Sequence, residues 1–189
     1  MNEDRMRNKI VAVYPELVEG SRSSISVQIS TLYLRIQYNM LTENLPLDFN
    51  FNNYLFSFDK EKIDADAVYK YLSEESYWAK NIPLDTVLRS FEHSICLGIY
   101  DVNNTLVGFG RIITDQATFA YLADVFILEA HRGKGLSKKM VEAFCHLADQ
   151  FGLRRMMLAT QDAHGLYKQF GFEQLTNPET IMNRKGAAY

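Results

Sequence analysis

The chain has 189 residues, of which 47% are hydrophobic and 23% are charged, and its formal net charge is −3. This size and composition fit one globular domain with a sizeable core and a short appended segment. The slight negative charge excludes broad binding to nucleic acid or to a membrane surface, which needs an excess of Lys and Arg. Because the sequence has no run of about 18 apolar residues, it predicts no membrane span.

The two cysteines, Cys96 and Cys145, lie far apart in the sequence and form no CxxC pair. We therefore expect neither a disulfide framework nor a bound metal ion. Reduced thiols are typical of cytosolic proteins, and the N-terminal residues lack the apolar core of a secretory signal. The sequence predicts a cytoplasmic protein.

Residues 1–50 differ from the rest of the chain and are interpreted as an N-terminal extension of uncertain role. Within it, Ser24–Met40 is rich in Ser, Thr, Ile, Val and Tyr, which indicates a peripheral strand or an unpaired arm. This apolar segment is also where a homodimer contact would form. Residues 51–189 are expected to make the folded domain.

The first elements of that domain are one strand and two helices. Alternation over Tyr54–Phe58 predicts a half-buried strand. Asp64 is expected to cap a helix that runs to Leu72. Pro83 suits the first turn of a second helix, which ends near Glu92.

Three strands and a long helix come next. Strands are expected over Ile95–Tyr100, Thr105–Thr114 and Thr118–Leu128, and the first two make a hairpin. Apolar residues at helical spacing then predict a helix over Gly135–Phe151. Gly152 is expected to close this helix.

The last predicted elements are short. Met156–Ala159 indicates a buried strand, and Asp162 is expected to cap a helix that ends at Phe170, before Gly171. Phe172–Leu175 would be a final strand. This order of elements predicts a mixed α+β sheet with at least one crossover connection. The order is one strand, two helices, three consecutive strands, and then alternating helices and strands.

The segment from residue 124 to residue 137 carries the clearest chemical signal, a buried strand that leads through a glycine turn into the long helix. Gly133 and Gly135 let the backbone approach a ligand closely. The N–H groups of such a turn, and the helix N-terminus, favour an anion. Arg132 and Lys134 add positive charge. We predict a pyrophosphate site, although a glycine turn alone often has only a steric role, and this one matches neither the P-loop nor the dinucleotide pattern.

Two segments resemble the signatures of the GNAT superfamily of N-acetyltransferases. Arg132-Gly-Lys-Gly-Leu-Ser137 is similar to the acetyl-CoA signature R/Q-x-x-G-x-G/A, with Ser137 where Gly or Ala is usual. The segment from Thr160 to Phe172 resembles the second signature, N-x-x-A-x-x-L-Y-x-x-x-G-F, with Thr160 where Asn is common. The resemblance covers about residues 51–184. It implies the GNAT acyl-CoA N-acyltransferase fold in its small bacterial single-domain form, a mixed and mostly antiparallel sheet flanked by helices.

The resemblance also implies the cofactor and the reaction. Acetyl-CoA would be the co-substrate, and the primary amine of a small molecule would attack it directly in a ternary complex. Pantetheine would bind in a gap where one strand splays from the next, against the backbone of Phe126, Ile127 and Leu128. The implied cofactor-binding residues further along the chain are Arg132, Gly133, Lys134, Gly135, Leu136, Ser137 and Thr160.

The same resemblance puts Tyr167 beside the thioester, where its hydroxyl suits protonation of the departing thiolate. Asp124, Tyr121 and His164 are candidates for taking the proton of the amine. The alternatives are structural: Tyr167 belongs to an aromatic core, Asp124 bonds to backbone at the end of a strand, and His164 is a surface residue.

Tyr77 and Trp78 either line the acceptor pocket or pack under the sheet. If they line it, an apolar or aromatic amine is permitted. An enzyme that acetylates a protein or peptide would have an open groove in place of a closed pocket. Two further hypotheses are a non-catalytic GNAT module that senses CoA and a phosphate-binding protein with a parallel sheet.

Overall fold

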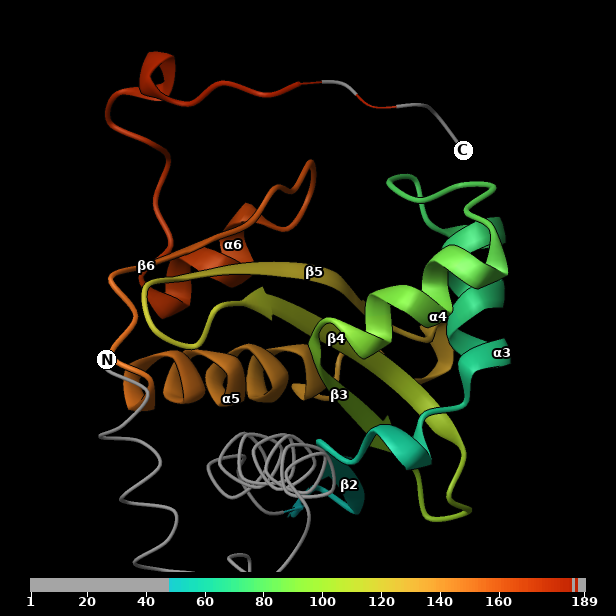
Figure 1. Cartoon of the computed structure of the whole chain (residues 1–189). Helices are drawn as coiled ribbons and strands as arrows, with labels where there is room; N and C mark the ends of the chain where they lie inside the picture. Colours follow the sequence, from blue (N-terminus) through green and yellow to red (C-terminus); the bar gives the residue numbers. More distant parts are fainter. Residues whose placement is uncertain (1–47, 185, 187–189) are drawn as a thin grey trace, which may run out of the picture. The chain divides into compact units, whose positions relative to one another are not determined.

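The computed structural model describes residues 48–184 and 186. Within this part of the chain, six strands form one sheet in the order β1-β2-β3-β4-β5-β6 (Figure 1). Neighbouring strands from β1 to β5 are antiparallel, and β6 pairs in parallel with β5. The strands are β1 (Phe49–Phe51), β2 (Tyr54–Ser57), β3 (Ile95–Tyr100), β4 (Leu106–Thr114), β5 (Phe119–Ile127) and β6 (Arg155–Met157). The predicted strand at Ser24–Met40 lies outside the described residues.

The helices begin within one residue of the predicted positions. They are α3 (Ala65–Lys70), α4 (Leu84–Glu92), α5 (Leu136–Gln150) and α6 (His164–Tyr167). The carboxylate of Asp64 accepts a hydrogen bond from the N–H of Ala67 at 3.0 Å, which caps α3, and Pro83 is the N-cap of α4. Helix α3 does not stop at Leu72, because a π-helical turn, Tyr71–Glu75, continues it. No helix among the described residues is long and apolar enough to cross a membrane.

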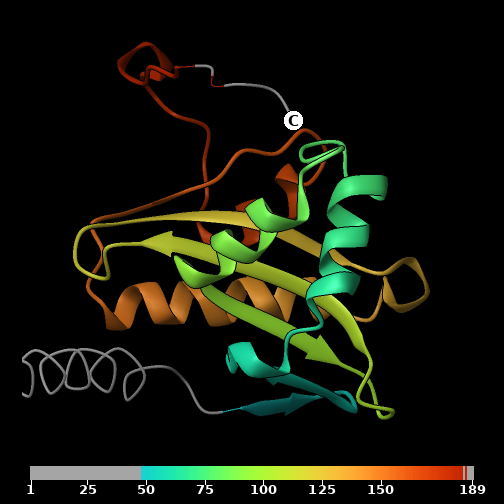
Figure 2. The ribbon, with the colours of Figure 1, turned by 45° about the vertical axis from the view of Figure 1, so that its right-hand side comes forward.

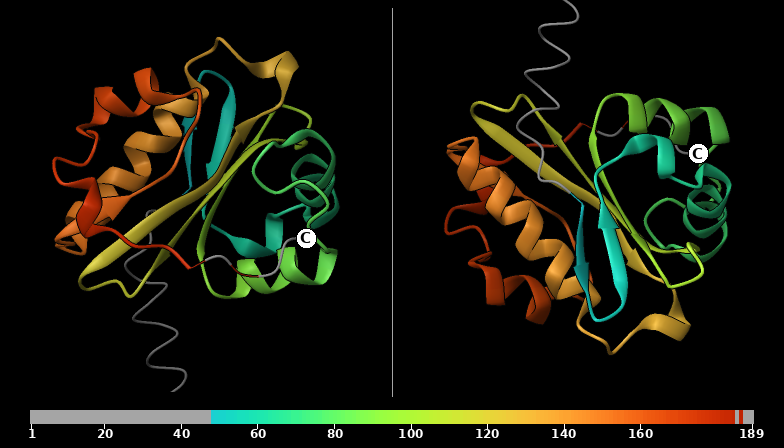
Figure 3. Two further views of the ribbon diagram at one scale, coloured as in Figure 1. Left: turned by 90° about the horizontal axis from the view of Figure 1, so that it is seen from above. Right: turned by 90° about the horizontal axis from the view of Figure 1, so that it is seen from below.

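The helices cover the sheet on both faces. Helices α3 and α4 lie on one face, and α5 and α6 lie on the other (Figures 2 and 3). The core under α3 and α4 includes the fully buried Val68, Val87 and Phe109. On the other face, a Cβ at Gly110 would lie 2.7 Å from the sulfur of Met140. Glycine in β4 therefore lets α5 approach the sheet closely.

A bulge distorts β5 in its second half. Phe109 pairs with Phe126, but Arg111 pairs with Ala123, so β5 holds one extra residue there. Asp124 has a φ of 54°, a left-handed conformation that is uncommon for a residue other than glycine. Such bulges bend a strand and re-aim its side chains.

Beyond the first three residues of β5, its second edge is open. β5 pairs with β6 only from Phe119 to Tyr121, because β6 ends at Met157. The strand predicted over Met156–Ala159 is thus shorter than expected and shifted. The splay between these strands, which the GNAT resemblance predicts, is present and places the candidate site.

Two predictions for the end of the chain are wrong. No strand follows β6 in the described residues; Phe172–Leu175 is irregular, and Pro178 begins a 3₁₀ turn. Only Phe172 of this segment is partly buried and the other three residues are exposed, so the segment has no apolar face packed against the sheet. Asp162 does not cap α6, since the N–H of Ala163 donates to Oγ1 of Thr160 at 3.0 Å.

Candidate active site

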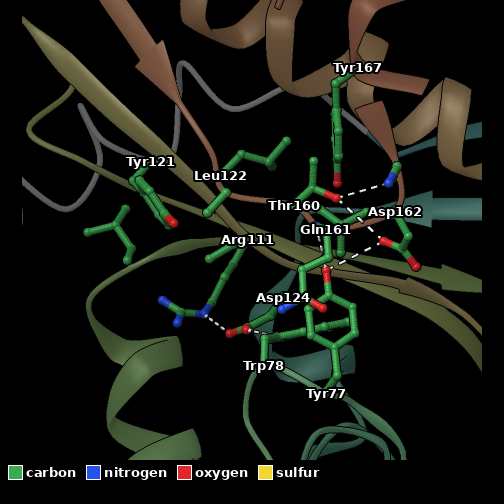
Figure 4. A pocket seen from close by; sticks show the side chains of 15 residues that line it. Tyr77, Trp78, Arg111, Tyr121, Leu122, Asp124, Thr160, Gln161, Asp162 and Tyr167 are labelled. Atoms are coloured by element: carbon green, nitrogen blue, oxygen red, sulfur yellow. Dashed lines mark hydrogen bonds and ion pairs between the residues drawn. The ribbon is translucent and has the colours of Figure 1, made fainter. Parts of the chain in front are cut away.

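A cavity of about 500 Å³ opens where β5 and β6 part (Figure 4). One wall comes from β4 and β5, a second from the loop after β6 together with α6, and a third from the segment that precedes α4. The lining residues are Tyr77, Trp78, Arg111, Ile113, Tyr121, Leu122, Ala123, Asp124, Val125, Ala159, Thr160, Gln161, Asp162, Ala163 and Tyr167. Six predicted site residues outside the cofactor loop therefore share one cavity: Tyr77, Trp78, Tyr121, Asp124, Thr160 and Tyr167. His164 is exposed and does not line it.

The N-terminus of α5 presents unpaired backbone donors. Gly133 and Gly135 have φ values of 75° and 79°, and Gly135 is the N-cap without a side-chain cap. Lys139 is the first residue of this helix whose N–H reaches a backbone acceptor, the carbonyl of Gly135 at 3.1 Å. Within the described residues, the N–H groups from Gly133 to Lys138 have no backbone acceptor. They form the kind of site that binds a phosphate group.

The basic side chains of this loop are held by neighbours. Arg132 donates from Nε to the carbonyl of Ile127 at 2.9 Å and from Nη2 to the hydroxyl of Tyr71 at 3.3 Å. Lys134 donates from Nζ to the hydroxyl of Tyr54 at 3.0 Å. Leu136 is buried, so only its backbone faces a ligand. These side chains fix the loop and add positive potential, while the backbone supplies the direct donors.

Only part of the predicted pantetheine edge is available. The N–H of Leu128 donates to the carbonyl of Val107 at 2.8 Å, on the β4 side. The backbone N–H groups of successive strand residues point to opposite sides. Since the N–H of Leu128 points to β4, the N–H of Ile127 faces the open edge and that of Phe126 points to β4. The carbonyl of Ile127 is already taken by Arg132. Of the three predicted residues, Ile127 is the one that offers a free donor.

Both carboxylate oxygens of Asp124 have strong partners. Nε1 of Trp78 donates to Oδ1 at 3.0 Å, and Nε of Arg111 donates to Oδ2 at 2.6 Å. Arg111 also donates from Nη1 to Oγ of the buried Ser94 at 2.9 Å. The side chains of Arg111 and Asp124 are only 14% and 10% exposed. This geometry favours a positioning role for Asp124 over the predicted role as base.

Arg111 and Ser94 were missed by the sequence reasoning. The available signal was Arg111 itself, the one charged residue in the strand Leu106–Thr114. A charge in a buried strand needs a partner, and the bulge at Asp124 brings that partner to it.

Tyr77 spans the cavity to the loop after β6. Its hydroxyl accepts from the N–H of Gln161 at 3.0 Å and donates to Oδ1 of Asp162 at 3.4 Å. Its ring meets that of Trp78 edge-on, with 4.9 Å between the ring centroids. Figure 4 shows this pair on the side of the cavity opposite Tyr167. Through Trp78 and Asp124 the same segment is anchored to β5.

Tyr167 is buried at the end of α6, and its ring meets that of Phe172 edge-on. Burial, followed by the nearby Tyr77 and the charge of Asp162, raises the pKa of Tyr167 to about 12. The phenol therefore stays neutral and able to donate a hydrogen bond at physiological pH. Thr160 also lines the cavity, but its Oγ1 already accepts from Ala163.

Comparison with known proteins decides the family. Residues 65–172 match the sequence model of the Acetyltransferase (GNAT) family. A candidate acetyltransferase from Gibberella zeae is 32% identical over an alignment of 147 residues, and the match covers 68% of this chain and 83% of that protein. The chain belongs to the GNAT acetyltransferase family.

Solved GNAT structures confirm the predicted fold. A candidate GNAT acetyltransferase from Xanthomonas campestris is 43% identical with a TM-score of 0.68, over 72% of this chain and 96% of that one. An acetyltransferase from Clostridium acetobutylicum, solved with acetyl-CoA, is 16% identical with a TM-score of 0.56, over 70% of this chain and 95% of that one. The second likeness shows the fold alone. The hypothesis of a phosphate-binding protein with a parallel sheet is therefore wrong.

Proposed function

We propose that this GNAT acetyltransferase transfers the acetyl group of acetyl-CoA to the primary amine of a small molecule, by direct attack in a ternary complex. One observation carries the proposal: the open edge of β5 leads from a Tyr167-lined cavity to the uncapped N-terminus of α5. The reduced cysteines favour a cytoplasmic setting.

Acetyl-CoA, when bound, supplies an activated acyl thioester. The free N–H groups from Gly133 to Lys138 are suited to its diphosphate. The N–H of Ile127 would bind the pantetheine arm as an added strand does. The family match to GNAT acetyltransferases supports this choice of co-substrate, and the structure from Clostridium acetobutylicum that shares this fold was solved with acetyl-CoA.

Tyr167 would act on the leaving group. The neutral amine forms a bond to the thioester carbon, and the carbon–sulfur bond breaks to release a thiolate. An ordinary thiol has a pKa of about 8.5, while that of Tyr167 is raised to about 12. Complete proton transfer from the phenol is therefore uphill. Its main contribution is a hydrogen bond to the developing thiolate, which then takes the proton that the acetylated nitrogen loses.

The bridge made by Tyr77 favours a small acceptor. Its hydrogen bond to Gln161 joins the segment before α4 to the loop after β6 across the cavity. An enzyme that acetylates a protein chain needs an open groove, which such a bridge obstructs. No observation favours the non-catalytic CoA sensor, since Tyr167 lines the cavity.

Two measurements test the proposal. Acetyl-CoA should raise the melting temperature of the full chain, whereas ATP and NAD should not. A panel of primary amines should then give acceptor-dependent release of CoA, detected as free thiol. Stabilisation by acetyl-CoA without thiol release for any amine would favour the sensor. No stabilisation at millimolar acetyl-CoA would contradict both.

A further inference from the structure

Asp162 is a carboxylate that the fold does not use. It does not cap α6, because Oγ1 of Thr160 takes the N–H of Ala163. Its own contacts are two long hydrogen bonds to Oδ1, from Tyr77 at 3.4 Å and from Thr160 at 3.5 Å. Within the described residues, Oδ2 has no hydrogen-bond or ion-pair partner. An acidic oxygen is thus available at the cavity rim (Figure 4).

The charges around the cavity do not cancel. The lining holds one arginine and two aspartates, a net charge of −1. Arg111 is already paired with Asp124 at 2.6 Å. The unpaired charge is therefore that of Asp162. Such a cavity attracts a cation and repels an acceptor that carries an additional carboxylate or phosphate.

The other walls suit a flat apolar body. Tyr77, Trp78 and Tyr121 contribute aromatic rings, and Ile113 contributes an aliphatic surface. Tyr77 and Trp78 are 47% and 40% exposed, so parts of both rings are open to a ligand in the cavity. Aromatic faces also attract an ammonium group.

We infer that Asp162, together with the hydroxyl of Tyr77, binds the ammonium group of the acceptor, and that the site takes arylalkylamines without an acidic group. This inference rests on the proposed acetyl transfer and names its acceptor class. Asp162 and Tyr167 line the same cavity, so an ammonium held at Asp162 shares that cavity with the phenol. The bound ammonium loses one proton to water before its neutral nitrogen attacks the thioester carbon, so Asp162 is a substrate-binding residue and not the base in this account.

Tryptamine and tryptophan test the inference, because they differ only in a carboxylate. Binding of each to the full chain in the presence of CoA is measured by calorimetry. We expect tryptamine to bind at least about 10-fold more tightly, because the negative charge of the cavity repels the additional carboxylate of tryptophan. Asp162→Asn should weaken tryptamine by about the same factor and raise its KM more than it lowers kcat. Glu173→Gln, at an exposed residue outside the cavity lining, is the matched control and should change neither.

Equal or tighter binding of tryptophan, no binding of tryptamine, or an unchanged tryptamine affinity in Asp162→Asn would overturn the inference. If the Asn variant fails to fold, the preference of the native chain for tryptamine still decides. Acetyl-CoA binding is titrated separately. If acetyl-CoA does not bind, the proposed function is overturned. If acetyl-CoA binds but tryptamine is not preferred over tryptophan, only the inferred class of acceptor is overturned.

Discussion

The indole N–H of Trp78 donates to Oδ1 of Asp124 at 3.0 Å, and this bond joins the segment before α4 to the bulge in β5. The two residues are 46 positions apart in the sequence. Because Arg111 holds the other carboxylate oxygen, Asp124 organises the acceptor wall and has no free oxygen for taking a proton.

Trp78→Phe should keep the aromatic wall and lose the donor to Asp124. A hydrogen bond to a charged group is worth about 1.5 kcal/mol at the low end, which corresponds to about a 10-fold loss of kcat/KM for the acceptor. The affinity for acetyl-CoA should not change. Steady-state kinetics and a calorimetric titration check both statements. If kcat/KM for the acceptor and the affinity for acetyl-CoA fell by the same factor, Trp78 would support the whole fold and not the cavity wall alone.

Arg111→Met should destabilise the chain by about 3 kcal/mol, because it leaves the Asp124 carboxylate buried without its cation. Urea unfolding of the native chain and the variant measures this difference in the free energy of unfolding. Asp124→Asn keeps a residue that tolerates the positive φ. The free energy of unfolding of the double variant should fall by clearly less than the sum of the two single decreases. A decrease equal to that sum would contradict the ion pair.

Tyr167→Phe should lower kcat by about 100-fold, the scale of one donor to a developing anion, and should spare acetyl-CoA binding. Tyr69→Phe is the matched control, because Tyr69 lies on α3 and does not line the cavity. An unchanged kcat in the Tyr167 variant would remove this hydroxyl from the mechanism.

The same substitution changes the pH dependence of stability. The pKa of Tyr167 is about 12 in the folded chain and about 10 when unfolded. Below pH about 10 both states keep the proton, so this residue contributes no pH dependence. Between about 10 and 12 the unfolded chain loses its proton first, and the free energy of unfolding falls as pH rises. Comparing native and Tyr167→Phe chains over this range should show a shallower fall in the variant.

Gly135→Ala and Gly152→Ala form a matched pair, because both glycines have positive φ values, 79° and 64°. Each substitution should cost about 1 kcal/mol of stability through backbone strain. Only the change at Gly135 should weaken acetyl-CoA, since Gly152 lies at the far end of α5. Equal affinity losses would contradict the assignment of the loop.

Local patterns predict most of this fold. Apolar runs bounded by turn residues predict β3, β4 and β5, and the apolar stripe predicts α5. Asp64 caps α3, as its side-chain chemistry suggests. The strand expected at Phe172–Leu175 does not form, because a few apolar residues do not by themselves supply a neighbouring strand to pair with. The three-residue β1 begins at Phe49, before the predicted start of the domain, and is too short to show a period.

The candidate site was predicted by family signature more than by physics. The GNAT resemblance identifies Tyr167 and the Gly133–Gly135 turn, but it says nothing of Arg111 or of the bridge from Tyr77 to Gln161. That bridge joins residues 84 apart. Such contacts depend on how the bulge and the splayed strands place distant side chains, which no local pattern encodes.

The most direct measurement compares acetyl-CoA with S-acetylpantetheine, which lacks the diphosphate, by calorimetry on the native chain and on Gly135→Asp. If the amide groups at the start of α5 bind the diphosphate, acetyl-CoA binds the native chain far more tightly than the truncated compound does, and the variant loses that difference. Similar affinities of the two compounds for the native chain, or an unchanged acetyl-CoA affinity in Gly135→Asp, would contradict the account.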